Sequence, residues 1–213
     1  MRQHRLGRIL EEKLVMIIRV KNPDDIDAIV ECFDLAGVRV LEITSNTPKY
    51  CDAIRRLKKA YPHLLIGAGT VTNASLAHEA IEAGAEFLVT PNTSEEIVSV
   101  AHQHEVPVLM GAFSPTEIVT AVEAGADIVK LFPAGSLGTE YLESLAKGPL
   151  NDVIFMPVGG VSDDNFKSWF DAGGKGVGIG GSLAQPVRSE EQKQALVQRL
   201  KAVVEQLHTK ERY

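Results

Sequence analysis

The sequence is poor in the residues that build metal centres and disulfide frameworks. Its 213 residues include two cysteines and six histidines. Cys32 and Cys51 have no CxxC spacing, which argues against a zinc site or a disulfide framework, so we expect both to be small core residues of a reducing, cytoplasmic protein. His102 and His104 are two residues apart and cannot share a helical face, so we expect them at the surface. The histidines and cysteines therefore show no pattern of metal ligands.

Positive charge and long apolar runs are also scarce. The formal net charge is −6 and the basic residues do not cluster, which argues against a nucleic-acid surface. The longest apolar runs have the length of a strand, so we expect no membrane span. Residues 1–13 are charged and lack the apolar core of a signal peptide. These absences favour a soluble, cytoplasmic protein that does not bind nucleic acid.

Apolar residues, by contrast, are plentiful and occur along the whole chain. They make up 45% of the chain, and the mean hydropathy is near zero, as in an ordinary soluble protein with an ample core. No linker or low-complexity stretch interrupts the sequence, and a parallel barrel reaches this length without splitting. We therefore predict one domain over residues 1–213.

Eight apolar segments alternate with segments of helical spacing, after a short amphipathic helix at the amino terminus. The expected strands are residues 14–20, 38–44, 64–70, 87–91, 106–111, 127–133, 153–160 and 176–182. The expected helices are residues 26–33, 48–60 and 139–147, further helices from residues 73, 94, 114 and about 162, and a last one over 190–207. Repetition at roughly forty-residue intervals could indicate a solenoid. Eight strands that are apolar on both faces favour an α/β fold, a closed (β/α)8 TIM barrel.

One lysine lies in the middle of an apolar strand. Burial of Lys130 in the segment 127–133 would lower its pKa, by up to roughly 3–5 units if burial is complete. A lysine that is neutral near physiological pH is a nucleophile that condenses with ketones to give an imine. The alternative is that Lys130 reaches solvent from a strand end or pairs with a carboxylate.

Position along the strand separates this lysine from other charged residues. Asp127 lies at a strand entrance, where it can stay hydrated. Arg19, Glu42 and Lys130 fall past the middle of the first, second and sixth strands, and barrel chemistry takes place at the carboxyl ends of strands. We expect the three to converge on one pocket. The alternative is a structural trio, in which pairing makes buried charge tolerable.

Glycines close the last two expected strands. Gly159 and Gly160 end the seventh, and Gly180, Gly181 and Ser182 end the eighth. Barrel enzymes often bind phosphate there with loop amides and the start of a short extra helix. Glycine lets the backbone approach an anion, and a hydroxyl can add a hydrogen bond. The alternative is that both segments are only tight turns.

Small residues also end the third strand. The sequence GAGT at 67–70 has little side-chain bulk and leaves space above it. Thr70 in this segment, and Thr44 at the end of the second strand, carry hydroxyls suited to hold a carboxylate or a water. Tight packing of the barrel is the competing interpretation.

Five motifs in order resemble a known family, the 2-keto-3-deoxy-6-phosphogluconate (KDPG) and 4-hydroxy-2-oxoglutarate (KHG) aldolases. They are GVRVLEIT at 37–44, GAGTV at 67–71, KLFPA at 130–134, GGV at 159–161 and GGS at 180–182. The resemblance spans nearly the whole chain. It implies a class I aldolase, usually a homotrimer, that works without a metal or other cofactor. Such an enzyme cleaves a phosphorylated 2-keto-3-deoxy sugar acid into pyruvate and glyceraldehyde 3-phosphate.

The resemblance also implies roles for individual residues. Lys130 would form the imine with the C2 ketone, and this imine would stabilise the carbanion left when the C3–C4 bond breaks. Glu42 would move protons as general acid and base, through a water. The implied substrate contacts are Thr70 and an arginine for the pyruvate carboxylate, Pro91 and Phe132 as walls around the imine, and the two glycine turns with Ser182 for the phosphate.

Two positions depart from the commonest pattern of that family. Many members carry an arginine four residues after the glutamate, where this chain has Asn46. Some relatives instead have an arginine in the first strand, where Arg19 stands. Val158 replaces the threonine of 6-phosphogluconate-type enzymes and resembles the relatives that act on 2-keto-3-deoxy-6-phosphogalactonate. Because exchange of a hydroxyl for a methyl could change the favoured C4 epimer, both epimers stay open as substrates.

Two other functions are compatible with the same barrel. A phosphosugar isomerase or epimerase would share the phosphate turns, but it needs a pair of bases for proton abstraction, whereas the expected pocket offers one carboxylate and a lysine. A non-catalytic sugar-phosphate-binding protein could also keep the barrel.

Overall fold

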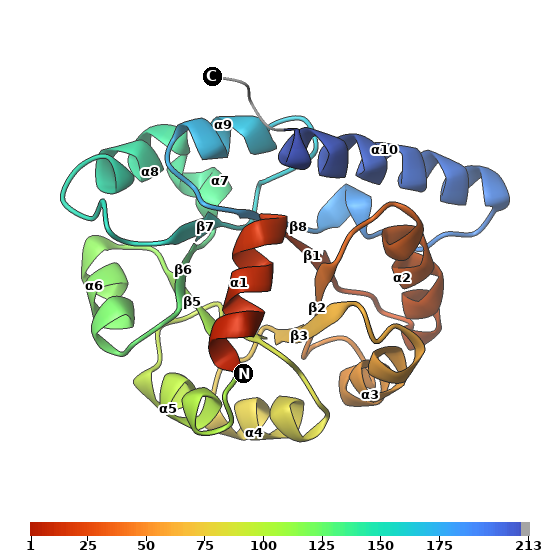
Figure 1. The fold of residues 1–213 in the computed structure, drawn as a ribbon, viewed down its shortest axis with the longest axis horizontal. Helices are drawn as coiled ribbons and strands as arrows, with labels where there is room; N and C mark the ends of the chain where they lie inside the picture. Colours follow the sequence, from red (N-terminus) through yellow and green to blue (C-terminus); the bar gives the residue numbers. More distant parts are fainter. Residues whose placement is uncertain (210–213) are drawn as a thin grey trace.

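Eight parallel strands form the centre of the molecule. The computed structural model describes residues 1–209. The strands pair in the order β7-β6-β5-β4-β3-β2-β1-β8, and the helices lie around them (Figure 1). The strands are β1 (Leu14–Ile18), β2 (Val40–Thr44), β3 (Leu65–Gly69), β4 (Leu88–Val89), β5 (Val108–Ala112), β6 (Ile128–Leu131), β7 (Phe155–Pro157) and β8 (Val177–Ile179). The predicted (β/α)8 barrel is confirmed.

The sheet closes on itself between β7 and β8. Val158, directly after β7, forms a parallel bridge with Gly178 of β8. A side chain at position 178 would place its Cβ 2.7 Å from Cγ2 of Val158, so this approach of the two strands requires glycine. Closure gives all eight strands a common interior.

The helices agree with the expected order, with local differences. Their bounds are α1 (Arg2–Glu12), α2 (Ile26–Leu35), α3 (Tyr50–Ala60), α4 (Ala74–Glu82), α5 (Glu95–Gln103), α6 (Pro115–Glu123), α7 (Ala134–Leu137), α8 (Thr139–Ala146), α9 (Phe166–Asp171) and α10 (Glu190–His208), with short 3-10 turns η1 (Pro23–Asp25) and η2 (Gly181–Leu183). Asn73 caps α4, and Ser114 forms a capping box with Glu117 at the start of α6. The sequence pattern does not indicate α7, and it places the start of α9 too early, because Asn165 is its N-cap.

The buried apolar side chains form two layers. One layer fills the interior of the ring and includes Val15 and Val40, while the other lies between strands and helices and includes Met16 and Leu41. Neighbouring residues of one strand belong to different layers because successive side chains point to opposite faces. Burial on both faces explains why these strands are apolar throughout.

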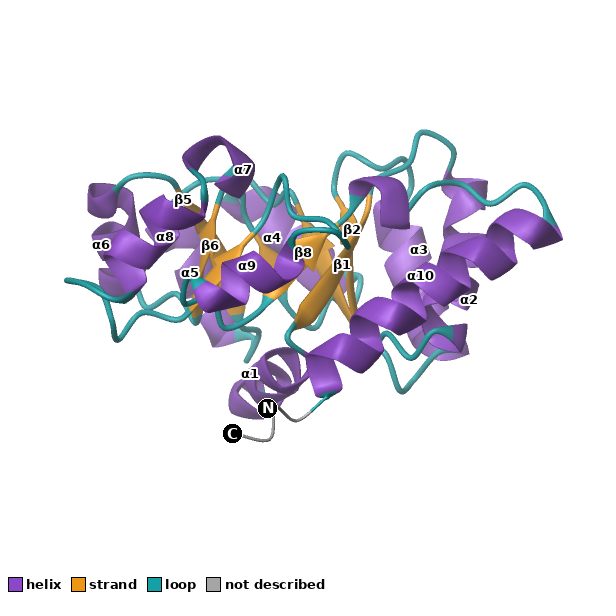
Figure 2. Ribbon diagram, turned by 90° about the horizontal axis from the view of Figure 1, so that it is seen from above, coloured by secondary structure: helices purple, strands orange, loops and turns teal. Residues whose placement is uncertain are grey.

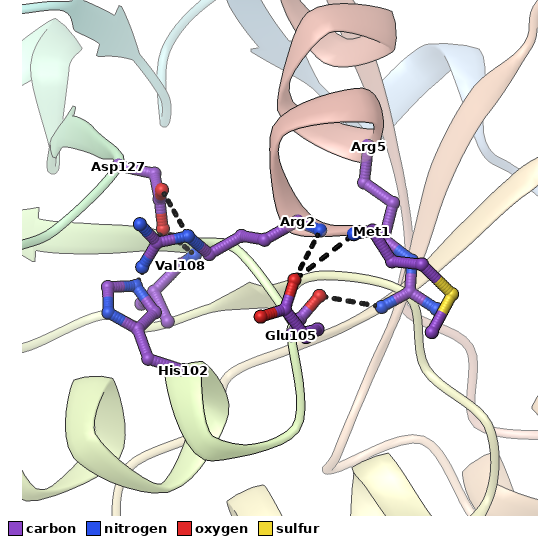
Figure 3. Close-up of polar contacts among 7 residues, drawn as sticks. All are labelled: Met1, Arg2, Arg5, His102, Glu105, Val108 and Asp127. Atoms are coloured by element: carbon purple, nitrogen blue, oxygen red, sulfur yellow. Dashed lines mark hydrogen bonds and ion pairs between the residues drawn. The ribbon is translucent and has the colours of Figure 1, made fainter.

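Helix α1 lies across the amino-terminal end of the barrel, on the side away from α7 (Figures 1 and 2). Arg2 pairs with Asp127 (Nε to Oδ1, 3.5 Å), which also accepts a hydrogen bond from the Val108 amide and contacts His102 Nε2, both at 2.9 Å (Figure 3). The Asp127 side chain is only 5% exposed. The expectation that Asp127 stays hydrated is therefore wrong, because α1 covers this strand entrance. His102 is half-buried by the same contacts and does not lie freely at the surface.

Both cysteines are free thiols. Cys32 is fully buried, as expected, whereas Cys51 is half-buried. Burial raises the pKa of both thiols, which makes them weaker nucleophiles near neutral pH. Within residues 1–209, no helix combines the length and the apolar character needed to cross a membrane.

We expect Asp127→Ala to lower the free energy of unfolding by about 2–3 kcal/mol, because the Val108 amide and the His102 and Arg2 side chains lose their shared partner in a nearly dry site. Chemical denaturation measures this loss. The control is Glu143→Ala, which removes an exposed pair with Lys147 and should cost about 0.5 kcal/mol or less. Equal losses in the two variants would contradict the structural role of Asp127.

Candidate active site

A cavity of about 510 Å³ opens at the carboxyl ends of the strands. This volume is within the usual range for small-molecule sites, roughly 300–1,000 Å³. The structure brings most of the sequence-predicted site residues to its walls: Arg19, Glu42, Thr70, Lys130, Phe132, Val158, Gly159, Gly160, Gly180, Gly181 and Ser182.

Lys130 lies in β6 with its side chain inside the ring. The residue is 5% exposed, and its Nζ is 4.5 Å from the centre of the Phe132 ring. Burial lowers the pKa of the amine, and the nearby positive charge of Arg19 lowers it further, while Glu42 opposes both effects. A buried amine with a lowered pKa is suited to attack a carbonyl carbon.

Glu42 lies in β2 and is even more buried than Lys130, with 2% of its surface exposed. Within the described residues, its Oε2 has no hydrogen-bond partner. Gly69 of β3 makes room for it, since a Cβ there would stand 2.6 Å from the Glu42 carboxyl carbon. Burial raises the pKa of Glu42 to about 7, although Lys130 and Arg19 both favour the ionised form. A buried carboxyl group that titrates near neutrality can give and take protons.

Arg19 and Thr70 meet at one side of the cavity. Arg19 follows the last residue of β1 and is exposed, so it belongs to the rim and does not share the burial expected for a charged trio. Its Nη2 donates a hydrogen bond to Thr70 Oγ1 at 3.2 Å. The backbone of Thr70 has a φ of 57°, in the left-handed region that β-branched residues rarely adopt, and Ser45 Oγ donates to the Thr70 carbonyl at 2.7 Å. This cation and hydroxyl can hold a carboxylate together.

The two glycine turns form another wall of the cavity. Gly159 and Gly160 have φ values of 82° and 85°, which favour glycine strongly. A Cβ at Gly160 would lie 2.7 Å from Cα of Gly135, so helix α7 packs closely on the loop after β7. In the turn after β8, Ser182 lies exposed in the 3-10 turn η2. This 3-10 turn (Gly181–Leu183) lies where barrel enzymes often place a short extra helix for phosphate binding.

Two expected site residues do not line the cavity. Thr44 is fully buried, and its hydroxyl donates to the Ile18 carbonyl at 3.3 Å and contacts Thr47 Oγ1 at 3.1 Å. Its hydroxyl is therefore engaged within the protein, contrary to expectation. Pro91 is half-buried, and its backbone lies against Gly111, where a Cβ would collide with it.

Sequence reasoning also missed residues that the cavity contains. Ile17, Ser162 and Gln185 belong to its lining. Ile17 could have been found by alternation, because it lies two residues after Val15, which faces the interior. Ser162 could have been found as the second residue after the glycine pair. Nothing in the local sequence indicates Gln185, which reaches the cavity from the segment after η2.

A buried amine and a buried carboxyl group therefore line one cavity at the carboxyl ends of the strands. The family model of KDPG and KHG aldolase matches residues 7–202. The chain belongs to the KDPG and KHG aldolase family, and it is an aldolase, a carbon–carbon lyase.

Individual relatives are similar over most of the chain. The 2-dehydro-3-deoxy-6-phosphogalactonate aldolase of Escherichia coli is 35% identical and covers 84% of this chain and 87% of its own. The 2-dehydro-3-deoxy-phosphogluconate aldolase of Pseudomonas aeruginosa is 38% identical and covers 75% of this chain and 72% of its own. A native KDPGal structure has a TM-score of 0.83 at 32% identity and covers 91% of this chain and 95% of its own. KDPG aldolase from Legionella pneumophila, with pyruvate captured at low pH as a covalent carbinolamine intermediate, has a TM-score of 0.80 at 26% identity, covering 95% and 97%.

The raised pKa of Glu42 predicts the pH dependence of aldol cleavage. Since the folded-state pKa is about 7, Glu42 becomes a base only as the pH rises through neutrality, so kcat/KM should rise there. In Glu42→Gln this rise should disappear, and kcat/KM should fall by about 10²–10⁴ because general acid–base catalysis is lost. Steady-state rates measured across this pH range test the prediction. Glu123→Gln, at an exposed carboxylate of α6, is the control. A Glu42→Gln enzyme with the wild-type profile would contradict the assignment.

Proposed function

We propose that this protein is a class I aldolase that cleaves 2-keto-3-deoxy-6-phosphogluconate, or its C4 epimer 2-keto-3-deoxy-6-phosphogalactonate, to pyruvate and D-glyceraldehyde 3-phosphate through a Schiff base on Lys130. The observation that carries this proposal is the burial of Lys130 and Glu42 in one cavity, where desolvation lowers the pKa of the amine and raises that of the carboxyl group. The relatives named for aldolases of these two sugar acids support the substrate class.

The proposed reaction begins with the attack of the Lys130 amine on C2 of the keto acid. Loss of water from the resulting carbinolamine gives an iminium ion. Glu42, through a water, takes the proton of the C4 hydroxyl, and the C3–C4 bond breaks. Its electron pair passes into the iminium to form an enamine, and the aldehyde leaves. Protonation of the enamine at C3 and hydrolysis of the iminium then release pyruvate and restore the free amine.

The two anionic groups of the substrate find different partners in the cavity. Arg19 and Thr70 are joined by a hydrogen bond of 3.2 Å and would hold the pyruvate carboxylate. The position of Arg19 supports the view that it supplies the cation that Asn46 lacks. The glycine turns and Ser182 would hold the phosphate, and this binding energy would help to position C2 over Lys130. Phe132 would shield the imine from water.

An isomerase or epimerase is less well supported. The cavity-lining residues in the described part of the chain include one carboxylate, Glu42, whereas proton abstraction and return on a sugar phosphate needs two acid–base groups. We therefore favour the aldolase over this alternative.

We further propose that residues 1–213 act as a single domain in a cytoplasmic homotrimer. Three exposed apolar side chains support the choice of contact surface: Phe113 precedes α6, and Val119 and Val122 share one face of this helix. Each is more than 40% exposed, and a subunit contact would remove this patch from water.

Borohydride trapping tests the Schiff base. Pyruvate and sodium borohydride together should leave a stable adduct on Lys130, because reduction of the imine gives a secondary amine, and peptide mass spectrometry locates it. Lys130→Met should fold but show neither adduct nor turnover. The control is Lys175→Met, at an exposed lysine, which should keep both. Absence of an adduct from folded wild-type protein with saturating pyruvate would reject the mechanism and favour a binding protein.

Val158→Thr tests the choice between C4 epimers. Val158 lines the cavity and packs on Gly178, and threonine has nearly the same shape, so folding should survive. We expect the ratio of kcat/KM values to shift toward the gluconate epimer by about tenfold, the effect of one well-placed hydroxyl. The matched control is Val161→Thr, at another valine of the lining. An unchanged ratio in Val158→Thr, or an equal shift in both variants, would refute the role of Val158.

A further inference from the structure

An arginine of the last helix contacts the glycine turns that we propose bind phosphate, although it does not itself line the cavity. Arg199 of α10 donates from Nη2 to Ser182 Oγ at 3.1 Å. The same guanidinium donates to both oxygens of Asp163, from Nε to Oδ2 at 2.8 Å and from Nη2 to Oδ1 at 3.0 Å. Ser182 lies in the turn after β8, and Asp163 lies in the loop after β7. A single side chain therefore connects the two segments that carry the glycine turns.

We propose that Arg199, held by Asp163, is a positioning residue for the binding of the substrate's terminal phosphate. It acts through Ser182 and does not line the cavity itself. The identity of the anion as a phosphorylated sugar acid rests on the proposed function. The role of Arg199 goes beyond it, because neither the sequence motifs nor the cavity lining indicates this residue.

The donor and acceptor chemistry fixes the orientation of the Ser182 hydroxyl. A guanidinium only donates hydrogen bonds, so Ser182 Oγ must accept from Arg199. The hydroxyl proton of Ser182 is then left to donate elsewhere, and Ser182 lines the cavity. The fork of Arg199 on the carboxylate of Asp163 removes the rotational freedom that a single hydrogen bond would leave. The Ser182 hydroxyl is therefore already oriented to donate a hydrogen bond to an anion in the cavity.

The distribution of charge around the cavity gives a second reason to assign Arg199 to phosphate binding. The cationic side chains of the cavity lining, in the described part of the chain, are Arg19 and Lys130, which serve the carboxylate and the imine in the proposed reaction. The glycine turns offer neutral groups to a phosphate that carries up to two negative charges. Arg199 supplies a positive charge one hydrogen bond behind Ser182, and Asp163 offsets part of it.

The decisive comparison uses the phosphorylated 2-keto-3-deoxy sugar acid and the same acid without its phosphate. In Arg199→Ala, the ratio of their kcat/KM values should fall about five- to tenfold, the worth of about one hydrogen bond. The fall should appear in KM for the phosphorylated acid, with kcat changed much less. Arg199→Lys keeps the positive charge but cannot form the paired hydrogen bonds of a guanidinium, so its ratio of kcat/KM values should lie between those of wild type and Arg199→Ala. The control is Lys201→Ala, which removes an exposed cation of the same helix and should leave the ratio unchanged.

A loss of equal size on both substrates would show that Arg199 only supports the fold, and an unchanged ratio would show that it does not act on the phosphate; either result would overturn the proposal. Calorimetric titration with inorganic phosphate separates this proposal from the proposed function. Arg199→Ala should bind phosphate about fivefold more weakly than wild type, even if neither sugar acid is cleaved. Cleavage of both acids with equal phosphate affinity in the two proteins would leave the aldolase standing and reject the role of Arg199.

Discussion

The active site depends on keeping an amine and a carboxyl group out of water in the same small space. Ionised side chains lose much of their hydration on burial, so each group is driven toward its neutral form. For Lys130 this lowers the pKa, and for Glu42 it raises the pKa to about 7. The charge of each group opposes the shift of the other, so neither pKa moves as far as burial alone would take it. The interior of a barrel provides this environment because a ring of apolar strands surrounds it on every side.

The room for these groups comes from positions without side chains. Gly69 leaves space for the Glu42 carboxyl group, and Gly111, paired with Lys130 across β5 and β6, lets the backbone at Pro91 approach. Where the strands end, left-handed backbone at Thr70 and Gly159 turns the chain around the cavity. Strain of this kind is maintained only when surrounding contacts hold it, as the hydrogen bond from Ser45 does for Thr70. The cavity is thus a property of the backbone as much as of the side chains.

The two ends of the barrel differ, because one is covered and the other is open. At the amino-terminal end, α1 and the contacts of Asp127 with Arg2 and His102 cover the strand entrances. At the carboxyl end the strands open into loops, and there the cation of Arg19 and the glycine turns surround the buried pair. One closed end and one open end give a substrate a single approach, and Lys130 lies 5% exposed beside the Phe132 ring at the bottom of that approach.

The sequence by itself determined the eight strands, the order of the helices apart from α7, and the placement of Lys130 and Glu42 within their strands. These features are local, because apolar periodicity and the position of a charge within a strand are read from a few consecutive residues. Tertiary structure alone decided that Asp127 is covered by α1, that the Thr44 hydroxyl turns to Ile18, and that Gln185 reaches the cavity. It also decided that Arg199 meets Ser182. Each of these facts depends on contacts between segments from different parts of the fold, and such contacts are set by the packing of helices and loops around the closed ring.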